Sequence, residues 1–141
     1  MDIRVGFSGG KRVDASFGER VIHTDQSVKN GGEGSAPEPF HLFLASLAAC
    51  AGVYVLGFCQ ARGISMDGIE LVQHHEYDPE TGRLADVRVD IRVPADFPEK
   101  YLAPLERVAA KCAVKRVIDA PPNFSIVARA QAVEPAVSAM T

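Results

Sequence analysis

The sequence has no tryptophan, and aromatic residues make up only 7% of its 141 residues. It also lacks a basic excess, since 15 lysines and arginines stand against 18 aspartates and glutamates, for a net charge of −3. Nucleic-acid-binding domains usually carry a clear basic surplus, so we expect no nucleic-acid partner. Hydrophobic residues at 47% and charged residues at 23% are close to globular averages, which excludes global disorder. The length predicts a single domain over residues 1–141.

Cysteine is also scarce. Cys50, Cys59 and Cys112 are too few for a disulfide scaffold, and they cannot complete a closed structural zinc site without histidine. The opening residues, MDIRVGFSGG, contain no apolar signal region. We therefore expect a cytoplasmic protein with reduced thiols and no resident metal or cofactor.

One uncharged run, residues 42–59, reaches the lower length limit for a membrane-spanning helix. It lies mid-chain between segments with strand patterns and is rich in alanine, serine and glycine. We therefore expect no membrane span but a helix that is apolar all round and buried on all sides. The remainder of the chain is short for covering such a helix, so we expect a second copy to cover part of it in a two-fold dimer.

Strand patterns occur on both sides of this helix. The first three predicted strands span 2–8, 12–17 and 20–24 and are followed by a polar, glycine-rich loop. The helix is predicted to begin near residues 35–40, where Ser35 and Glu38 fit a capping box. It is predicted to run to about Arg62, with Gly63 as the stop signal.

The second half of the chain begins with the clearest strand pair, residues 66–77 and 84–93. The second of these strands alternates apolar and charged side chains, which is typical of an antiparallel sheet with one buried face. Two helical stretches are predicted between residues 96 and 120, and residues 123–131 predict a closing strand. The fold class is therefore α+β, with antiparallel sheets around a long buried central helix.

Helix geometry limits which thiols can cooperate. Cys50 and Cys59 lie nine residues apart, which places them on opposite sides of one helix, so neither can pair with the other while the helix is intact. Cys112 is the remaining long-range partner, and Lys115 and Arg116 follow it at helical spacing. Free cysteines often only fill space in a core, so a redox role and a packing role are both compatible with these positions.

Two segments resemble the cysteine motifs of a known family. Residues 39–50, PFHLFLASLAAC, resemble the first motif of the OsmC/Ohr family, the osmotically inducible protein C and organic hydroperoxide resistance proteins. Residues 111–118, KCAVKRVI, resemble the second motif. The resemblance extends over roughly residues 3–131, including the order of the predicted elements.

This resemblance implies an intertwined homodimer and a thiol peroxidase that acts on organic hydroperoxides in oxidative stress defence. Carried over, Cys50 is the peroxidatic cysteine, which becomes a sulfenic acid. Cys112 is the resolving cysteine, which forms a disulfide with Cys50, and a dithiol of the lipoyl type restores both thiols.

Other family positions match less closely. The family arginine lies in the N-terminal hairpin, where Arg12 is the nearest match and Lys11 is next to it. The family glutamate lies ten residues before the first cysteine, where this chain has Phe40. Glu38 is nearby, but we expect it to cap the helix. The proline after the second cysteine is replaced by Ala113. These departures indicate a divergent branch.

Phe40, Phe43 and Tyr54 are expected to form an apolar wall of the pocket, favouring alkyl or lipid hydroperoxides over hydrogen peroxide. Two alternatives follow from the same residues. The protein could be a small-molecule binding protein with little or no turnover, because Phe40 replaces the glutamate. It could also hold a metal ion through Cys50, Cys112 and one histidine. The candidate histidines are His23, His41, His74 and His75.

Overall fold

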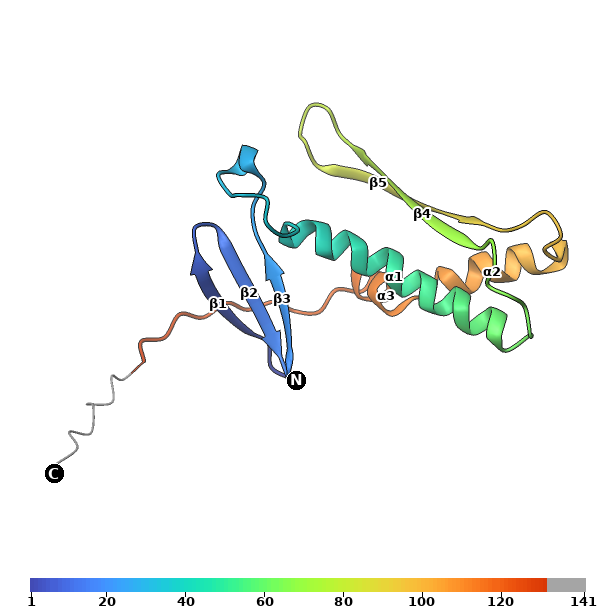
Figure 1. The fold of residues 1–141 in the computed structure, drawn as a ribbon, viewed down its shortest axis with the longest axis horizontal. Helices are drawn as coiled ribbons and strands as arrows, with labels where there is room; N and C mark the ends of the chain where they lie inside the picture. Colours follow the sequence, from blue (N-terminus) through green and yellow to red (C-terminus); the bar gives the residue numbers. More distant parts are fainter. Residues whose placement is uncertain (132–141) are drawn as a thin grey trace, which may run out of the picture.

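The computed structural model describes residues 1–131, so residues 132–141 of the predicted domain lie outside the described part. The fold is a mixture of antiparallel strands and helices around one long helix, as predicted (Figure 1). The elements are β1 (Arg4–Gly9), β2 (Arg12–Phe17), β3 (Arg20–Thr24), α1 (Pro39–Gln60), β4 (Glu70–Tyr77), β5 (Leu84–Arg92), α2 (Leu102–Ala109) and α3 (Ala113–Asp119). Short 3₁₀ turns occupy Val28–Asn30 and Glu99–Tyr101.

The N-terminal strands form an antiparallel three-stranded sheet in the order β1-β2-β3. Gly9 and Gly10 make the first turn with positive φ angles of 104° and 59°, a conformation that glycine adopts without strain. The sheet lies near the start of α1, at the end of the helix farther from α2 (Figure 1). Its apolar side chains are largely open, with Phe7 85% exposed and Val5 59% exposed. Residues 1–131 of one chain therefore do not cover the sheet.

Asp25 organises the loop between β3 and α1. Its buried carboxylate accepts hydrogen bonds from the backbone N–H groups of Gln26, Glu33 and Ser35 and from the Ser35 hydroxyl. These bonds, those from Ser35 above all, lower the pKa of Asp25 to about 2. Gly32 completes the turn, because a Cβ there would lie 2.0 Å from the Gln26 carbonyl oxygen.

The predicted capping box at the start of α1 is wrong. The residue preceding the helix is Glu38, and its carboxylate makes no cap bond but accepts from the Ser27 N–H at 2.9 Å and the Asn30 amide at 3.0 Å. These bonds, led by Ser27, hold the pKa of Glu38 below its ordinary value. Ser35 is engaged with the preceding loop instead, and Pro39 at the first helical position has no N–H to cap. The loop thus uses the side chains that the sequence pattern assigned to the helix.

The core forms where α1 meets α2. Its buried members are Ala51, Val55, Phe58, Cys59, Leu105 and Ala109. Side chains of the β4–β5 hairpin and of the segment that precedes α2 pack around this cluster. Burial of this apolar surface is the main force that joins α2 to the central helix.

Residues 1–131 of one chain bury only part of α1, so burial of the helix on all sides with the help of a second copy stays a prediction. Leu44 and Val55 are buried, whereas Val53 is 64% exposed and Phe43 is 42% exposed. Among the described residues, α1 is the one helix long and apolar enough to cross a membrane, and 28% of its most apolar stretch is buried. Residues 1–131 therefore leave part of the helix surface uncovered.

The C-terminal region departs from the prediction at residues 123–131. This segment is not part of a sheet, and it makes no backbone hydrogen bond to other described residues. Phe124 is 83% exposed and Ile126 is fully exposed. A strand requires a paired neighbour, and within residues 1–131 the chain supplies none, so its strand-like sequence pattern is not realised here.

Candidate functional site

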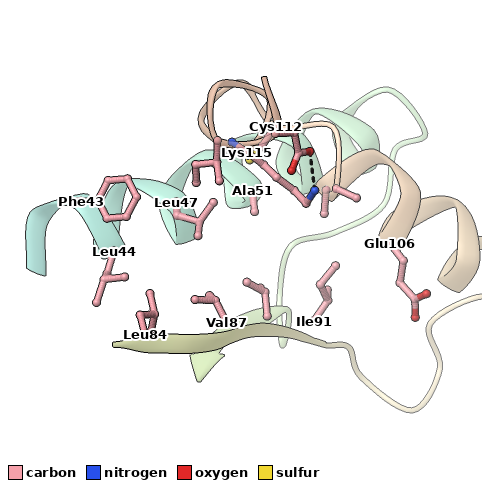
Figure 2. A pocket seen from close by; sticks show the side chains of 15 residues that line it. Phe43, Leu44, Leu47, Ala51, Leu84, Val87, Ile91, Glu106, Cys112 and Lys115 are labelled. Carbon is pink, nitrogen blue, oxygen red and sulfur yellow. Dashed lines mark hydrogen bonds and ion pairs between the residues drawn. The ribbon is translucent and has the colours of Figure 1, made fainter. Parts of the chain in front are cut away.

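A cavity of about 460 Å³ lies between α1, β5 and the α2–α3 region (Figure 2). Its aliphatic and aromatic lining comes mainly from Phe43, Leu44, Leu47, Leu84, Val87, Val89, Ile91 and Ile118. The strand wall follows from period-two alternation, because every second residue of β5 points to the same face. The predicted apolar face of that strand is therefore confirmed, and it faces this cavity.

Charged side chains of the cavity lining come from α2 and α3. Glu106 lies on α2, and Lys115 and Asp119 lie one turn apart on α3. The Lys115 ammonium and the Asp119 carboxylate form an ion pair at 2.8 Å, drawn as a dashed line in Figure 2. The cavity therefore combines an apolar interior with a small charged group on one side.

Cys112 is part of the cavity wall and is 1% exposed. The helical stretch breaks after α2 and restarts at Ala113, which makes Cys112 the residue that precedes α3. Its sulfur accepts a hydrogen bond from the Lys115 N–H at 3.4 Å. An N–H donor directed at a sulfur stabilises negative charge on it. The Cys112 thiol is thus buried and has one polar partner, the Lys115 N–H.

Cys50 lies on α1, one residue before Ala51, which contributes to the same cavity wall as Cys112. It is half-buried, and the three cysteines are all free thiols. The cavity lining itself includes Cys112 but not Cys50. Cys50 therefore borders the cavity through its helix neighbour, and it belongs neither to the cavity lining nor to the buried core cluster.

The predicted aromatic wall is divided. Phe43 lines the cavity, and Phe40 stacks on it with ring centroids 5.8 Å apart and planes at 28°. Phe40 itself is 47% exposed, and Tyr54 is half-buried outside the cavity lining. The structure therefore brings Phe43 to the cavity directly and Phe40 through the stack.

Cys59 is fully buried in the core on the same helix. Burial raises the pKa of its thiol, and the positive charge of Arg62 offsets part of this effect. The Arg62 guanidinium lies 3.6 Å from the centre of the Phe58 ring. This environment makes Cys59 a packing residue and a poor nucleophile.

Arg12 lies on β2 in the N-terminal sheet. Its guanidinium donates to the Glu33 carboxylate at 2.6 Å, and no hydrogen bond among the described residues joins it to Cys50 or Cys112. Lys11 is exposed in the adjoining turn. The structure thus gives Arg12 a carboxylate partner and does not bring it together with the two cysteines.

The histidines are spread over the fold. His23 contacts Asp14 at 2.9 Å and His74 contacts Asp90 at 3.1 Å. Within residues 1–131, no group of three or more His, Cys, Asp or Glu side chains is placed to hold a metal ion. The described residues therefore offer no support for the metal-site alternative.

Sequence reasoning missed one polar group beside the cavity. The Gln73 amide nitrogen lies 2.9 Å from the Leu44 carbonyl oxygen and 2.7 Å from His75 Nε2. The signal was available, because Leu71, Gln73 and His75 alternate along one strand and therefore share a face. Two polar residues on a face that packs against a helix indicate a specific contact.

Comparison with known proteins agrees with this geometry. A chain from Psychrobacter arcticus, described as an osmotic stress induced and detoxification response protein, is 23% identical with a TM-score of 0.68, over 81% of this chain and 85% of that one. An OsmC-like protein from Mycoplasma pneumoniae is 14% identical with a TM-score of 0.64, over 85% and 87% of the two chains. An organic hydroperoxide resistance protein OsmC from Legionella pneumophila is 19% identical with a TM-score of 0.52, over 85% and 90%. These similarities show a shared fold.

A comparison with curated proteins finds no match. The family model described as OsmC-like protein matches residues 32–127, which is more than half of the chain and includes both cysteine segments. The long central helix, the antiparallel sheets and this match lead to one conclusion: the chain belongs to the OsmC family.

Proposed function

We propose that the protein is a thiol-dependent peroxidase that reduces alkyl or lipid hydroperoxides in oxidative stress defence. The observation that carries this proposal is the position of Cys112 in the wall of an apolar cavity, with Ala51, the neighbour of Cys50, in the same wall. An enzyme for apolar peroxides needs a nucleophilic thiol, a second thiol within reach and an apolar site for the substrate. Membership of the OsmC family and the hydroperoxide resistance protein among the structural neighbours support the same class.

The reaction begins at Cys50. Its thiolate attacks one peroxide oxygen, the S–O bond forms as the O–O bond breaks, and the alkoxide leaves and takes a proton to become an alcohol. Cys50 is thereby oxidised to a sulfenic acid. The Cys112 thiolate then attacks that sulfur, forming the S–S bond and releasing water after protonation of the leaving hydroxide. An external dithiol, such as a lipoyl group, reduces the disulfide by exchange and is itself oxidised.

The cavity favours a substrate with an apolar tail. Its strand wall is formed by Val87, Val89 and Ile91, and its helix wall includes Phe43 and Leu47. An alkyl chain placed there gains about 0.8 kcal/mol for each buried methylene group, which hydrogen peroxide cannot gain. Organic hydroperoxides are therefore the substrates that we propose.

A second copy of the chain is part of the proposal. Large apolar side chains are exposed on the N-terminal sheet, on α1 and in the segment after α3. They include Val5, Phe7, Val53, Leu56, Phe124 and Ile126. A soluble chain seldom leaves so many large apolar groups open to water, and a homodimer would cover them. The cation that supports the Cys50 thiolate would be Arg12, brought to the cysteine by the dimer rather than within one chain.

One observation favours a second candidate function, that of a binding protein without turnover. At the position of the family glutamate, Phe40 stacks on Phe43 at the edge of the cavity. An aromatic pair adds apolar contact area for a ligand but supplies no carboxylate to the reaction. Cys50 would then only lie beside a bound small molecule.

Steady-state reduction of cumene hydroperoxide, with dihydrolipoamide as the reductant, tests the proposal. We expect turnover by the wild type, loss of peroxide reduction in Cys50→Ser, and loss of the intramolecular disulfide in Cys112→Ser. Cys59→Ser is the matched control and should retain turnover, because that thiol only packs in the core. A wild-type protein that binds cumyl alcohol but does not consume the hydroperoxide would instead select the binding function.

A further inference from the structure

Gln73 joins the β4–β5 hairpin to the central helix. Its amide nitrogen lies 2.9 Å from the Leu44 carbonyl oxygen of α1 and 2.7 Å from Nε2 of His75 on its own strand. Within residues 1–131, this is the hydrogen bond that links the hairpin to α1, and no second one is present. Leu71 and Ile91 of the hairpin also pack against the core cluster, so Gln73 provides the polar part of the attachment.

The two contacts fix the protonation pattern of the pair. A carbonyl oxygen can only accept, so the group that Gln73 presents to Leu44 must be its NH₂. The same nitrogen faces His75 Nε2, and a nitrogen that already carries donors can bond there only if Nε2 accepts. The Gln73–His75 contact is therefore a hydrogen bond only in the imidazole tautomer that carries its proton on Nδ1. A protonated imidazole has N–H donors at both positions and cannot accept this bond.

The pair also borders the cavity. In the antiparallel register, Gln73 lies opposite Val89 and His75 lies opposite Val87. Both valines line the cavity, so the pair lies on the adjoining strand of the same sheet face. The Gln73 Oε1 atom is buried and has no hydrogen-bond partner. Rotation of the amide would place this oxygen against the Leu44 carbonyl oxygen and leave the NH₂ group without that acceptor.

We propose that the Gln73–His75 pair is a proton-sensitive attachment that holds the hairpin against α1 and thereby controls access to the cavity. When His75 takes up a proton, the Gln73 NH₂ faces a donor. It must give up either His75 or Leu44, because the amide oxygen would meet the carbonyl oxygen of Leu44 if the group rotated. The hairpin is then released from α1 more often, and the cavity opens.

The charged groups of the cavity that the pair borders are Glu106 on α2 and the Lys115–Asp119 ion pair on α3. Further charged groups lie on the outer face of the hairpin and on α1. On the strands, Glu76 faces Asp86 and His74 faces Arg88, and these residues alternate with His75 onto the outer face of the hairpin. On α1, His41 lies one turn before Leu44.

The rate of Cys112 alkylation by an uncharged maleimide reports access to the cavity, because this thiol is 1% exposed and lies in the wall. The measurement uses Cys50→Ser/Cys59→Ser protein, in which Cys112 is the sole thiol. His75→Gln is the test variant, since a glutamine oxygen accepts from Gln73 at any pH. At each pH, the alkylation rate of the protein that retains His75 is divided by the rate of the His75→Gln variant. This ratio removes the effect of pH on the reactivity of the Cys112 thiol itself. His74→Gln is the matched control on the outer face.

Between about pH 8 and pH 5, the range in which histidines titrate, we expect this ratio to rise about fivefold, the factor for one hydrogen bond of typical strength. The His74→Gln variant of the same protein, divided by His75→Gln in the same way, should show the same rise. An unchanged ratio overturns the proposal. So does an NMR spectrum at pH 8 that shows the His75 proton on Nε2, a measurement that needs no variant. Neither result depends on peroxide turnover, so the proposed enzyme activity can fail while this attachment stands.

Discussion

The packing of α2 on α1 can be tested at Leu105. Its side chain is 1% exposed and lies in the core cluster with Val55 and Phe58. Leu102, on the same helix, is 39% exposed and lies outside that cluster. The two leucines thus offer the same substitution in opposite environments on one short helix.

The expected cost follows from this burial. Truncating a fully buried leucine to alanine removes the transfer free energy of the lost carbons and leaves a void that neighbours fill only in part. We expect Leu105→Ala to lower the free energy of unfolding by about 3 to 4 kcal/mol. Leu102→Ala should cost less than about 1 kcal/mol, because its side chain already contacts water. Leu105→Ala should also slow formation of the Cys50–Cys112 disulfide, since α2 leads directly into Cys112.

Urea unfolding monitored by far-ultraviolet circular dichroism measures both changes. Wild type and variants must be compared at equal protein concentration, because the stability of the proposed dimer would depend on concentration. A cost for Leu105→Ala as small as that for Leu102→Ala would refute the assignment of the core to the contact between α1 and α2.

Three further predictions concern the loop, the dimer and the cation. Asp25 has a folded pKa of about 2 against an ordinary value of 3.8, so its stabilising effect is present above about pH 4 and is lost as the pH falls towards 2. Urea unfolding at several pH values should therefore show a weaker acid dependence in Asp25→Asn. Val53→Asp should convert the proposed dimer to a monomer in sedimentation, whereas Val28→Asp, at an exposed position outside α1, should not. Arg12→Ala should slow the reaction of Cys50 with peroxide by about tenfold or more, and Lys11→Ala by less than about twofold, in stopped-flow measurements.

Much of the fold could be predicted from local patterns. β2 and β3 begin and end at the predicted residues, because glycine turns and alternating side chains define them. The alternation of β5 also predicted which face would be apolar. Gly63, with a φ of 64°, lies just after the end of α1 as its sequence position suggested.

The remaining features depend on competition between groups that are distant in sequence. Ser35 and Glu38 match a capping box, but in the structure Ser35 donates to the Asp25 carboxylate and Glu38 accepts from the Ser27 N–H instead. Residues 123–131 have a strand pattern, yet a strand forms only against a neighbour. No local pattern reports whether such a partner is in the same chain.

The candidate site could be predicted in part. Cys112 and Phe43 were identified from motifs and do lie in the cavity wall. The charged pair of Lys115 and Asp119 in that wall results from the break between α2 and α3. The contact of Gln73 with Leu44 joins residues far apart in sequence, which a motif of contiguous residues does not describe.

The mass of the intact protein after one equivalent of cumene hydroperoxide shows whether Cys50 and Cys112 form a disulfide during the reaction. A disulfide between Cys50 and Cys112 lowers the mass by about two units, and tryptic mapping should locate it between those two residues. The same treatment of Cys59→Ser should give the same product. A wild-type protein that keeps both thiols under stoichiometric peroxide would contradict the proposed peroxidase mechanism.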